Sequence, residues 1–285
     1  MDVDSSAEAL RNWLGGRVRS LLAGDRPLPQ RQEGEDDGLF GPGSVIWRVH
    51  SSSAMLVGGI RALLLQTLHP QAMAGVAEHS DYRSDPWGRL HRTGDFVAAT
   101  TFGTTAQAES AIGRVRRVHE RVVGIGPDGL PYRASDPHLL AWVHATEVDS
   151  FLRAYQRYDS GPFGPPDQDR YVAEMAEVAS RLGVVSPPVD RAELNAYLHG
   201  IRSELRGTPA ARAAVKFILQ PPVPTVAKAA YGSLSSAAVG LLPGFARREL
   251  RLVLPPGFDT LAAQPAARIV LAGLRWLLTP PAVAA

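Results

Sequence analysis

Apolar residues recur at spacings of three and four along most of the chain from residue 44 onwards. This spacing is typical of amphipathic α-helices. Proline and glycine interrupt the pattern, which divides into roughly ten helical segments. Neither an internal repeat nor a convincing strand pattern occurs. The sequence therefore predicts an all-α fold, with a single multi-helix domain over residues 44–285.

The N-terminal part of the chain differs from this domain. Residues 5–23 have helical spacing of apolar side chains and predict a short helix. Residues 24–43 are rich in proline, glycine and acidic residues, a composition typical of a loop. We therefore treat residues 1–43 as an N-terminal helix and loop that precede the domain.

Several helix boundaries can be located from the sequence. Ser44 stands directly before an apolar segment and is a candidate N-cap. Residues 124–137 form a clear break, rich in glycine and proline. At its end, Ser135 or Asp136 caps a helix that has proline in its first turn. This helix is expected to run to about Tyr158.

Composition excludes several classes of function. The chain has 285 residues, a formal net charge of +2 and no cysteine. Without cysteine it has no disulfide, thiolate metal site or cysteine nucleophile, and without a clustered basic face it is not expected to bind nucleic acid. No signal peptide is evident. The most apolar stretch, residues 54–68, is short and interrupted by Arg61 and Gln66, so we expect a soluble cytoplasmic protein with no transmembrane segment.

Two adjacent glycines, Gly58 and Gly59, lie inside a predicted helix, where glycine is less favourable than alanine. Such a pair suggests that something approaches the backbone closely. Tight packing against another helix is the favoured interpretation, and contact with a flat cofactor is the alternative.

A histidine lies in the middle of an apolar helical face. When residues 112–123 are projected on a helix, Ile112, Val115, Val122 and Val123 form one stripe, with His119 at its centre. A lone histidine in this position is more often a core residue bonded to a carbonyl than a ligand. The stripe predicts only that His119 faces inward.

A second inward-facing histidine raises the chance of a metal or haem site. His144 projects to the same face as Leu140 and Phe151, with Glu147 nearby. A zinc site needs three or more converging ligands, and no HExxH motif or close histidine pairing occurs. A di-iron bundle needs Glu-x-x-His motifs, whereas Glu147 follows His144. Haem, which a neutral imidazole ligates well, is the better metal hypothesis.

Arg89 and Thr93 are four residues apart and share one face of a predicted helix. An arginine beside a hydroxyl suits a carboxylate, a haem propionate or bound dioxygen. The alternative is structural: Arg89 bonds a helix terminus and Thr93 caps one, near the helix start that Asp85, Pro86 and Gly88 indicate.

Several motifs occur together and in order: GPGSVIWRVH, LLLQTLHPQAMAGVAEHS, RLHRTGDFVAATTFGT, VRRVHERVVG and DGLPYRASDPHLLAWVHATEVDSFLRAYQRY. In this combination the chain resembles the catalytic domain shared by latex-clearing proteins (rubber oxygenases) and the fungal oxygenase of mycophenolic acid biosynthesis, MpaB. The resemblance covers about residues 41–241. It implies a globin-like all-α domain around a buried haem b, with one histidine as the axial iron ligand and an arginine and a threonine near the oxygen site.

Carried over position by position, the resemblance makes His119 the iron ligand and Arg89 and Thr93 the catalytic residues, with Arg89 also contacting the cofactor. His144 remains an alternative ligand, because the threonine-to-histidine spacing varies in the family. Latex-clearing proteins have a lysine directly before the threonine, where this chain has Arg92. Latex-clearing proteins are also exported, and the fungal enzyme is membrane-bound, whereas this sequence shows no evident signal peptide or anchor. We therefore expect a smaller molecule inside the cell as substrate, rather than an extracellular polymer.

Three functions follow as hypotheses. The first is a haem b oxygenase, in which His119-ligated iron activates dioxygen to oxidise a small apolar molecule, such as an isoprenoid, inside the cell. The second keeps the haem and changes the reaction to dehydrogenation or peroxidation. The third is a helical carrier of an apolar ligand without catalysis, in which the histidines are core residues. The oligomeric state does not follow from the sequence.

Overall fold

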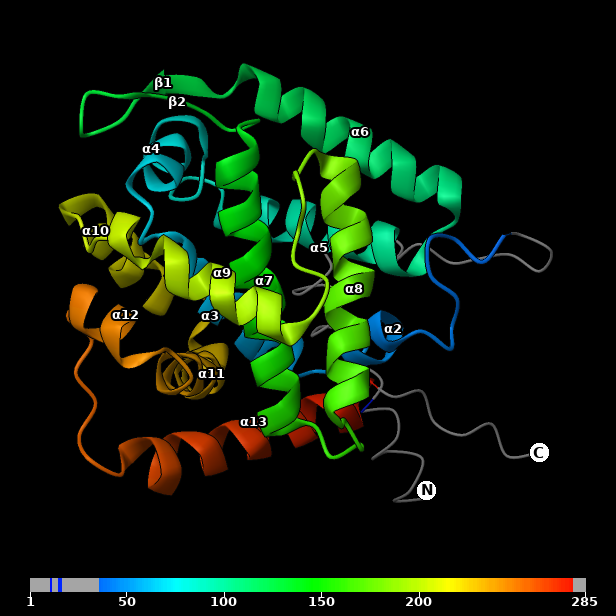
Figure 1. The fold of residues 1–285 in the computed structure, drawn as a ribbon. Coiled ribbons are helices and arrows are strands. Elements are labelled where there is room, and N and C mark those ends of the chain that lie inside the picture. Colours follow the sequence, from blue (N-terminus) through cyan, green and yellow to red (C-terminus); the bar gives the residue numbers. More distant parts are fainter. Residues whose placement is uncertain (1–10, 12–14, 17–35, 279–285) are drawn as a thin grey trace, which may run out of the picture.

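The chain folds almost entirely into α-helices in a computed structural model, which describes residues 11, 15–16 and 36–278 (Figure 1). The described part contains twelve α-helices: α2 (Val45–His50), α3 (Met55–Gln66), α4 (Pro70–His79), α5 (Pro86–Phe102), α6 (Thr105–Arg121), α7 (Pro137–Tyr158), α8 (Pro165–Leu182), α9 (Arg191–Gly200), α10 (Pro209–Leu219), α11 (Lys228–Gly240), α12 (Gly244–Glu249) and α13 (Gln264–Leu278). Shorter helical turns lie between some of them: η1 (Ile201–Glu204), η2 (Thr225–Ala227) and η3 (Asp259–Ala263). The all-α prediction is confirmed. The predicted helix over residues 5–23 and most of the following loop lie outside the described residues.

Local sequence signals explain where the helices begin. The Ser44 hydroxyl accepts a hydrogen bond from the backbone amide of Trp47 and caps α2, as predicted. The Asp136 carboxylate does the same for His138 at the start of α7, which ends at Tyr158 as expected. The Thr104 side chain and Gln107 form a reciprocal capping box at the start of α6, a signal that we did not predict.

α7 is the central helix of the fold. In Figure 1 it runs beside α8, while α6 crosses the ends of both. On one side, α7 packs with α3 in a core that continues through α10, α11, α12 and α13. On the other, it packs with α2 and α8 in a second core. Most side chains of α7 are consequently buried.

The contact between α3 and α7 depends on Gly58. A Cβ atom at this position would lie 2.7 Å from the Cδ1 atom of Phe151 on α7. Nothing lies within 4 Å of the corresponding position at Gly59. For Gly58, the interpretation as tight helix packing is confirmed.

The same contact contains a buried ion pair. Arg61 Nη2 lies 2.7 Å from Asp149 Oδ2, and their side chains are only 2% and 6% exposed. Arg61 also donates to the Ser150 hydroxyl at 2.7 Å and to the Leu241 carbonyl at 3.0 Å. The arginine that interrupts the apolar run in the sequence is therefore a fully paired core residue.

The prediction that the chain has no strands was wrong at one place. β1 (Val123–Ile125) and β2 (Pro131–Arg133) form a small antiparallel hairpin after α6. Helix α6 ends at Arg121, so Val122 and Val123 do not belong to the helical stripe proposed from the sequence. Two successive β-branched valines followed by Gly124 favour the extended chain. The Tyr132 hydroxyl comes within 2.5 Å of where a Cβ at residue 124 would be, which leaves room only for glycine.

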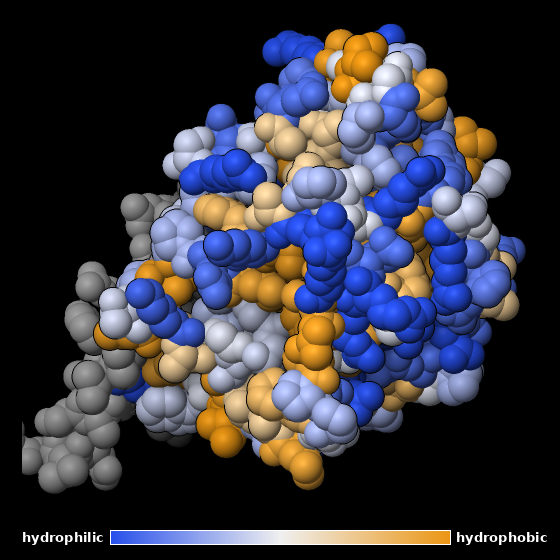
Figure 2. Space-filling model, turned by 90° about the vertical axis from the view of Figure 1, so that its left-hand side faces the viewer, coloured by the Kyte–Doolittle hydropathy of each residue, from blue (hydrophilic) through white to orange (hydrophobic). Residues whose placement is uncertain are grey.

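Among the described residues, no helix combines the length and the apolar character needed to cross a lipid bilayer. Figure 2, which views the side of the molecule where α4 and α10 lie in Figure 1, shows hydrophilic residues gathered across the middle of that face, with apolar residues interspersed.

Candidate functional site

A cavity opens between α2, α5, α6, α7 and α8. Its enclosed volume is small, about 70 Å³, within a wider space of about 580 Å³ that includes open solvent. Ligand pockets commonly have mostly apolar walls with a few polar groups. The cavity is lined by such a set: Ile46, His50, Phe96, Val97, Thr100, His119, Leu140, Val143, His144, Glu147, Met175, Val178, Ala179, Leu182 and Val184.

His119 lies at the boundary of this cavity, in the last turn of α6. It also lines an adjoining polar recess of about 110 Å³, together with Arg116, Glu120 and Ser135. Burial lowers the pKa of its imidazole, which is therefore neutral at pH 7. None of the described residues forms a hydrogen bond with its ring. The predicted inward orientation of His119 is confirmed.

His144 reaches the same cavity from α7. Its side chain is buried, and its Nε2 atom has no hydrogen-bond partner among the described residues. Burial lowers the pKa of His144 to about 4, so this imidazole is also neutral at pH 7. A buried polar atom without a partner is costly in a folded protein and calls for an explanation. A ligand in the cavity would provide one.

Glu147 lies one helical turn after His144 and lines the same cavity. Its side chain is half-buried. Burial raises the pKa of Glu147 to about 7. A carboxyl group that titrates near neutral pH is suited to accept and donate protons. From the sequence, Glu147 was noted only because it follows His144, which is the reverse of the order in a di-iron motif.

The sequence analysis missed a third histidine in the cavity, His50. Its Nδ1 atom lies 2.7 Å from the Thr101 hydroxyl, and its Nε2 atom lies 3.1 Å from the Tyr171 hydroxyl. Burial lowers its pKa to about 3. Both ring nitrogens are occupied, so His50 acts as a fixed wall of the cavity. Its position at the end of an apolar six-residue helix, α2, was the available signal.

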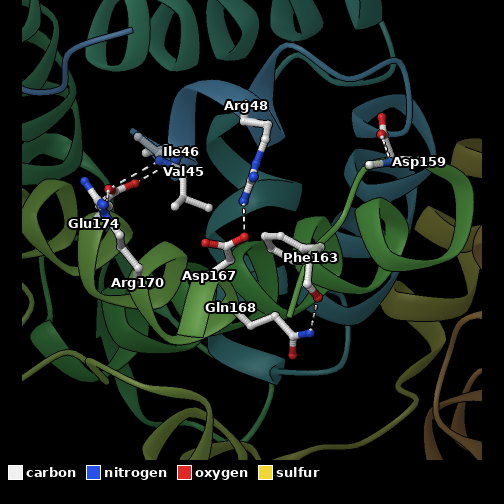
Figure 3. A network of polar contacts seen from close by, with 10 residues as sticks. Val45, Ile46, Arg48, Asp159, Phe163, Asp167, Gln168, Arg170 and Glu174 are labelled. Atoms are coloured by element: carbon white, nitrogen blue, oxygen red, sulfur yellow. Dashed lines mark hydrogen bonds and ion pairs between the residues drawn. The ribbon is translucent and has the colours of Figure 1, made fainter. Parts of the chain in front are cut away.

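A polar network fixes α2, and with it His50, on α8 (Figure 3). The Glu174 carboxylate accepts hydrogen bonds from the backbone amides of Val45 and Ile46 at 3.3 and 2.6 Å. A carboxylate at a helix N-terminus satisfies free amides and interacts favourably with the helix dipole. Further along α2, Arg48 Nη2 lies 2.6 Å from Asp167 Oδ2. These contacts give the cavity wall formed by α2 a defined position.

Arg89 and Thr93 lie on α5, before the part of that helix that reaches the cavity. Neither is among the lining residues. Arg89 is half-buried, and burial lowers the pKa of its guanidinium. Thr93 is exposed, and its hydroxyl donates to the Arg89 carbonyl at 3.0 Å. The structure thus does not bring this pair together with His119 and His144, and its catalytic role stays a prediction.

The start of α5 is stabilised by other residues. The Asp85 carboxylate caps the helix by accepting from the Gly88 amide at 2.9 Å. Arg92, which takes the place of the family's lysine, pairs with Asp85 at 3.2 Å on the surface. Thr93 is therefore not the cap that the structural alternative supposed.

The chain belongs to the family described as ER-bound oxygenase mpaB/B'/Rubber oxygenase, catalytic domain, which it matches over residues 47–278. The match extends beyond the 41–241 region in which the motifs were recognised and also takes in α12 and α13. No curated protein and no solved structure matches the chain. The domain is thus that of an oxygenase, a class of oxidoreductase.

The residues around the cavity fit a haem group. A haem needs an apolar, enclosed site and a neutral imidazole with a free nitrogen. The cavity is largely apolar, His119 and His144 both line it, and the Nε2 atom of His144 has no hydrogen-bond partner among the described residues.

Proposed function

We propose that this protein is a haem b-dependent oxygenase that acts on a small apolar molecule. One observation carries the proposal: His119 on α6 and His144 on α7 line one largely apolar cavity, and the Nε2 atom of His144 has no hydrogen-bond partner among the described residues. The family supports the reaction class, since its members are oxygenases.

His119 would ligate the iron, with His144 as the alternative. Position in the family motif favours His119. Its place at the cavity mouth leaves its ring free of protein hydrogen bonds. His144 has an equally free Nε2 atom deeper inside, on the same helix as Glu147. Ligation by either one leaves the other beside the reaction site.

A bound haem would supply the oxygen chemistry, which the protein tunes through its ligand, its polar groups and the exclusion of water. The apolar walls from α5 and α8 would bind an apolar substrate, such as an isoprenoid, and exclude water. Glu147 would hold or release a proton within the cavity, since its pKa is about 7. Arg89 and Thr93 would orient oxygen or a propionate, as the resemblance implies. A location in the cytoplasm stays a prediction from the sequence.

The absorption spectrum of the purified protein tests the proposal. We expect a Soret band and one haem b per chain, measured as the pyridine haemochrome. His119→Ala should lose the haem or shift the spectrum to one without histidine ligation. His199→Ala, which removes an exposed histidine on α9, is the matched control and should leave the spectrum unchanged.

His144→Ala separates the two candidate ligands. It should retain the haem if His119 ligates the iron, and the opposite pattern reassigns the ligand to His144. A folded protein that stays colourless after haem reconstitution overturns the proposal. It would instead favour a carrier of apolar ligands, which the apolar walls of the cavity would also suit.

A further inference from the structure

Three metal-ligating side chains meet outside the cavity. His138 Nε2 lies 2.7 Å from Glu204 Oε2, and His69 Nε2 lies 3.6 Å from the same oxygen. One ligand atom from each of the three residues lies within 4.8 Å of the other two. Their positions in the sequence are far apart, which is why no histidine pairing or zinc motif was visible there.

The backbone holds these side chains in place. His69 is the N-cap residue of α4, directly before Pro70. His138 lies in the first turn of α7, and Glu204 is the last residue of η1. The Arg206 amide donates to the Leu68 carbonyl at 2.8 Å, which ties the chain after η1 to the residue before His69. Three separate segments of the fold therefore meet at a fixed point.

His69 itself indicates a missing ligand. The residue is only 3% exposed, yet neither ring nitrogen has a hydrogen-bond partner among the described residues. An imidazole nitrogen without a hydrogen bond has a lone pair that can bind a metal. An unsatisfied buried imidazole is unfavourable, whereas a metal bond would satisfy it.

We propose that His69, His138 and Glu204 form a binding site for a divalent transition-metal ion, with Zn²⁺ as the ion that best suits the ligands. Two imidazoles and one carboxylate with an open fourth position are a common zinc ligand set. Donor atoms on one tetrahedral zinc ion lie about 3.3 Å apart, given bond lengths of about 2.0–2.1 Å. The two measured distances, 2.7 and 3.6 Å, lie on either side of this value, so small side-chain rotations suffice.

Exposure gives the ion a route to the site. The side chains of His138 and Glu204 are 48% and 44% exposed, so an ion can enter from solvent and keep a water ligand. The bound ion would join the starts of α4 and α7 to the end of η1. None of its three ligands lines the haem cavity, so the proposal does not depend on the proposed function.

Isothermal titration of the full chain with Zn²⁺ tests the site. We expect one Zn²⁺ per chain, and a rise in melting temperature on adding the metal. His138→Ala and Glu204→Gln change exposed side chains and should leave the fold intact. Each should weaken Zn²⁺ binding roughly tenfold or more, which corresponds to about 1.4 kcal/mol, and remove the metal-dependent rise in melting temperature. His199→Ala is the matched control and should bind as the unaltered chain does.

Two results would overturn the assignment. One is an unaltered chain that takes up no stoichiometric Zn²⁺. The other is tight binding that persists in either ligand variant. If binding persists there but is lost in His119→Ala, the ion occupies the cavity rather than this site.

Discussion

Polar side chains on two faces of α7 differ in whether they have hydrogen-bond partners. On the face toward α3, Asp149 and Ser150 are both bonded to the Arg61 guanidinium. On the cavity face, His144 has an unpartnered nitrogen, and the half-buried Glu147 has a pKa raised by desolvation. Both faces belong to the same helix, and Asp149 and His144 are similarly buried. The paired groups stabilise the contact between α7 and α3, whereas His144 and Glu147 line a cavity in which a ligand would provide partners.

The largest effect on stability is expected on the face of α7 that packs against α3. Asp149→Asn should destabilise the protein by about 3–5 kcal/mol, because it leaves the Arg61 charge buried without a partner. The free energy of unfolding in urea measures this loss. Arg153→Ala removes the other arginine that is bound to Asp149. The side chain of Arg153 is 49% exposed. As a control it should cost less than about 1 kcal/mol. Equal losses in both variants would contradict the distinction between buried and exposed pairing.

On the cavity face, Glu147 should make stability depend on pH. Its pKa rises from 4.5 in the unfolded chain to about 7 in the fold. Below pH 4.5 the carboxyl is protonated in both states and the shift has no effect. Between pH 4.5 and pH 7 the carboxyl ionises in the unfolded chain but stays protonated in the fold, so stability falls by about 3 kcal/mol in total, and above pH 7 both states are ionised and the loss is complete.

Glu147→Gln removes this dependence. The stability of the unaltered chain relative to the variant should therefore fall between pH 4.5 and pH 7.5. His50, His119 and His144 line the same cavity and are neutral at pH 7 through burial, so they supply no opposing positive charge there. A difference in unfolding free energy that is constant with pH would show that the Glu147 carboxyl is solvated.

Substitutions at Gly58 and Gly59 test how tightly α3 packs against α7. Gly58→Ala places a methyl group against Phe151 and should cost about 1–3 kcal/mol. Gly59→Ala meets no neighbour within 4 Å and should stabilise α3 by roughly 0.5–1 kcal/mol. Melting temperatures that shift in opposite directions support the helix contact. A stabilising Gly58→Ala would refute it.

The smallest effect on stability is expected at Thr93. Its exposed hydroxyl bonds only the carbonyl of its own helix, so Thr93→Ala should change the unfolding free energy by less than about 0.5 kcal/mol. If the family role applies, oxygen consumption with a substrate should nevertheless be lost while haem is retained. Unchanged turnover would remove Thr93 from the site.

Local patterns were sufficient for the helices and for some of their limits. The caps at Ser44 and Asp136 depend on neighbours a few residues away, and both were predicted. The end of α6 was misplaced because Val122 and Val123 continue the apolar spacing in either a helix or a strand. The contact of Gly124 with Tyr132 decides between them, and it involves a residue on the other strand of the hairpin.

The sequence by itself determined the all-α class, the family and the inward orientation of His119 and His144, since each depends on periodicity or on ordered motifs. Only the tertiary structure decided that these two rings share one cavity with His50 and Glu147, and that His69, His138 and Glu204 meet elsewhere. Helical periodicity shows which face of a helix is buried, but not which other helix covers it. Packing of helices distant in the sequence decides that, and with it whether a buried polar group finds a partner.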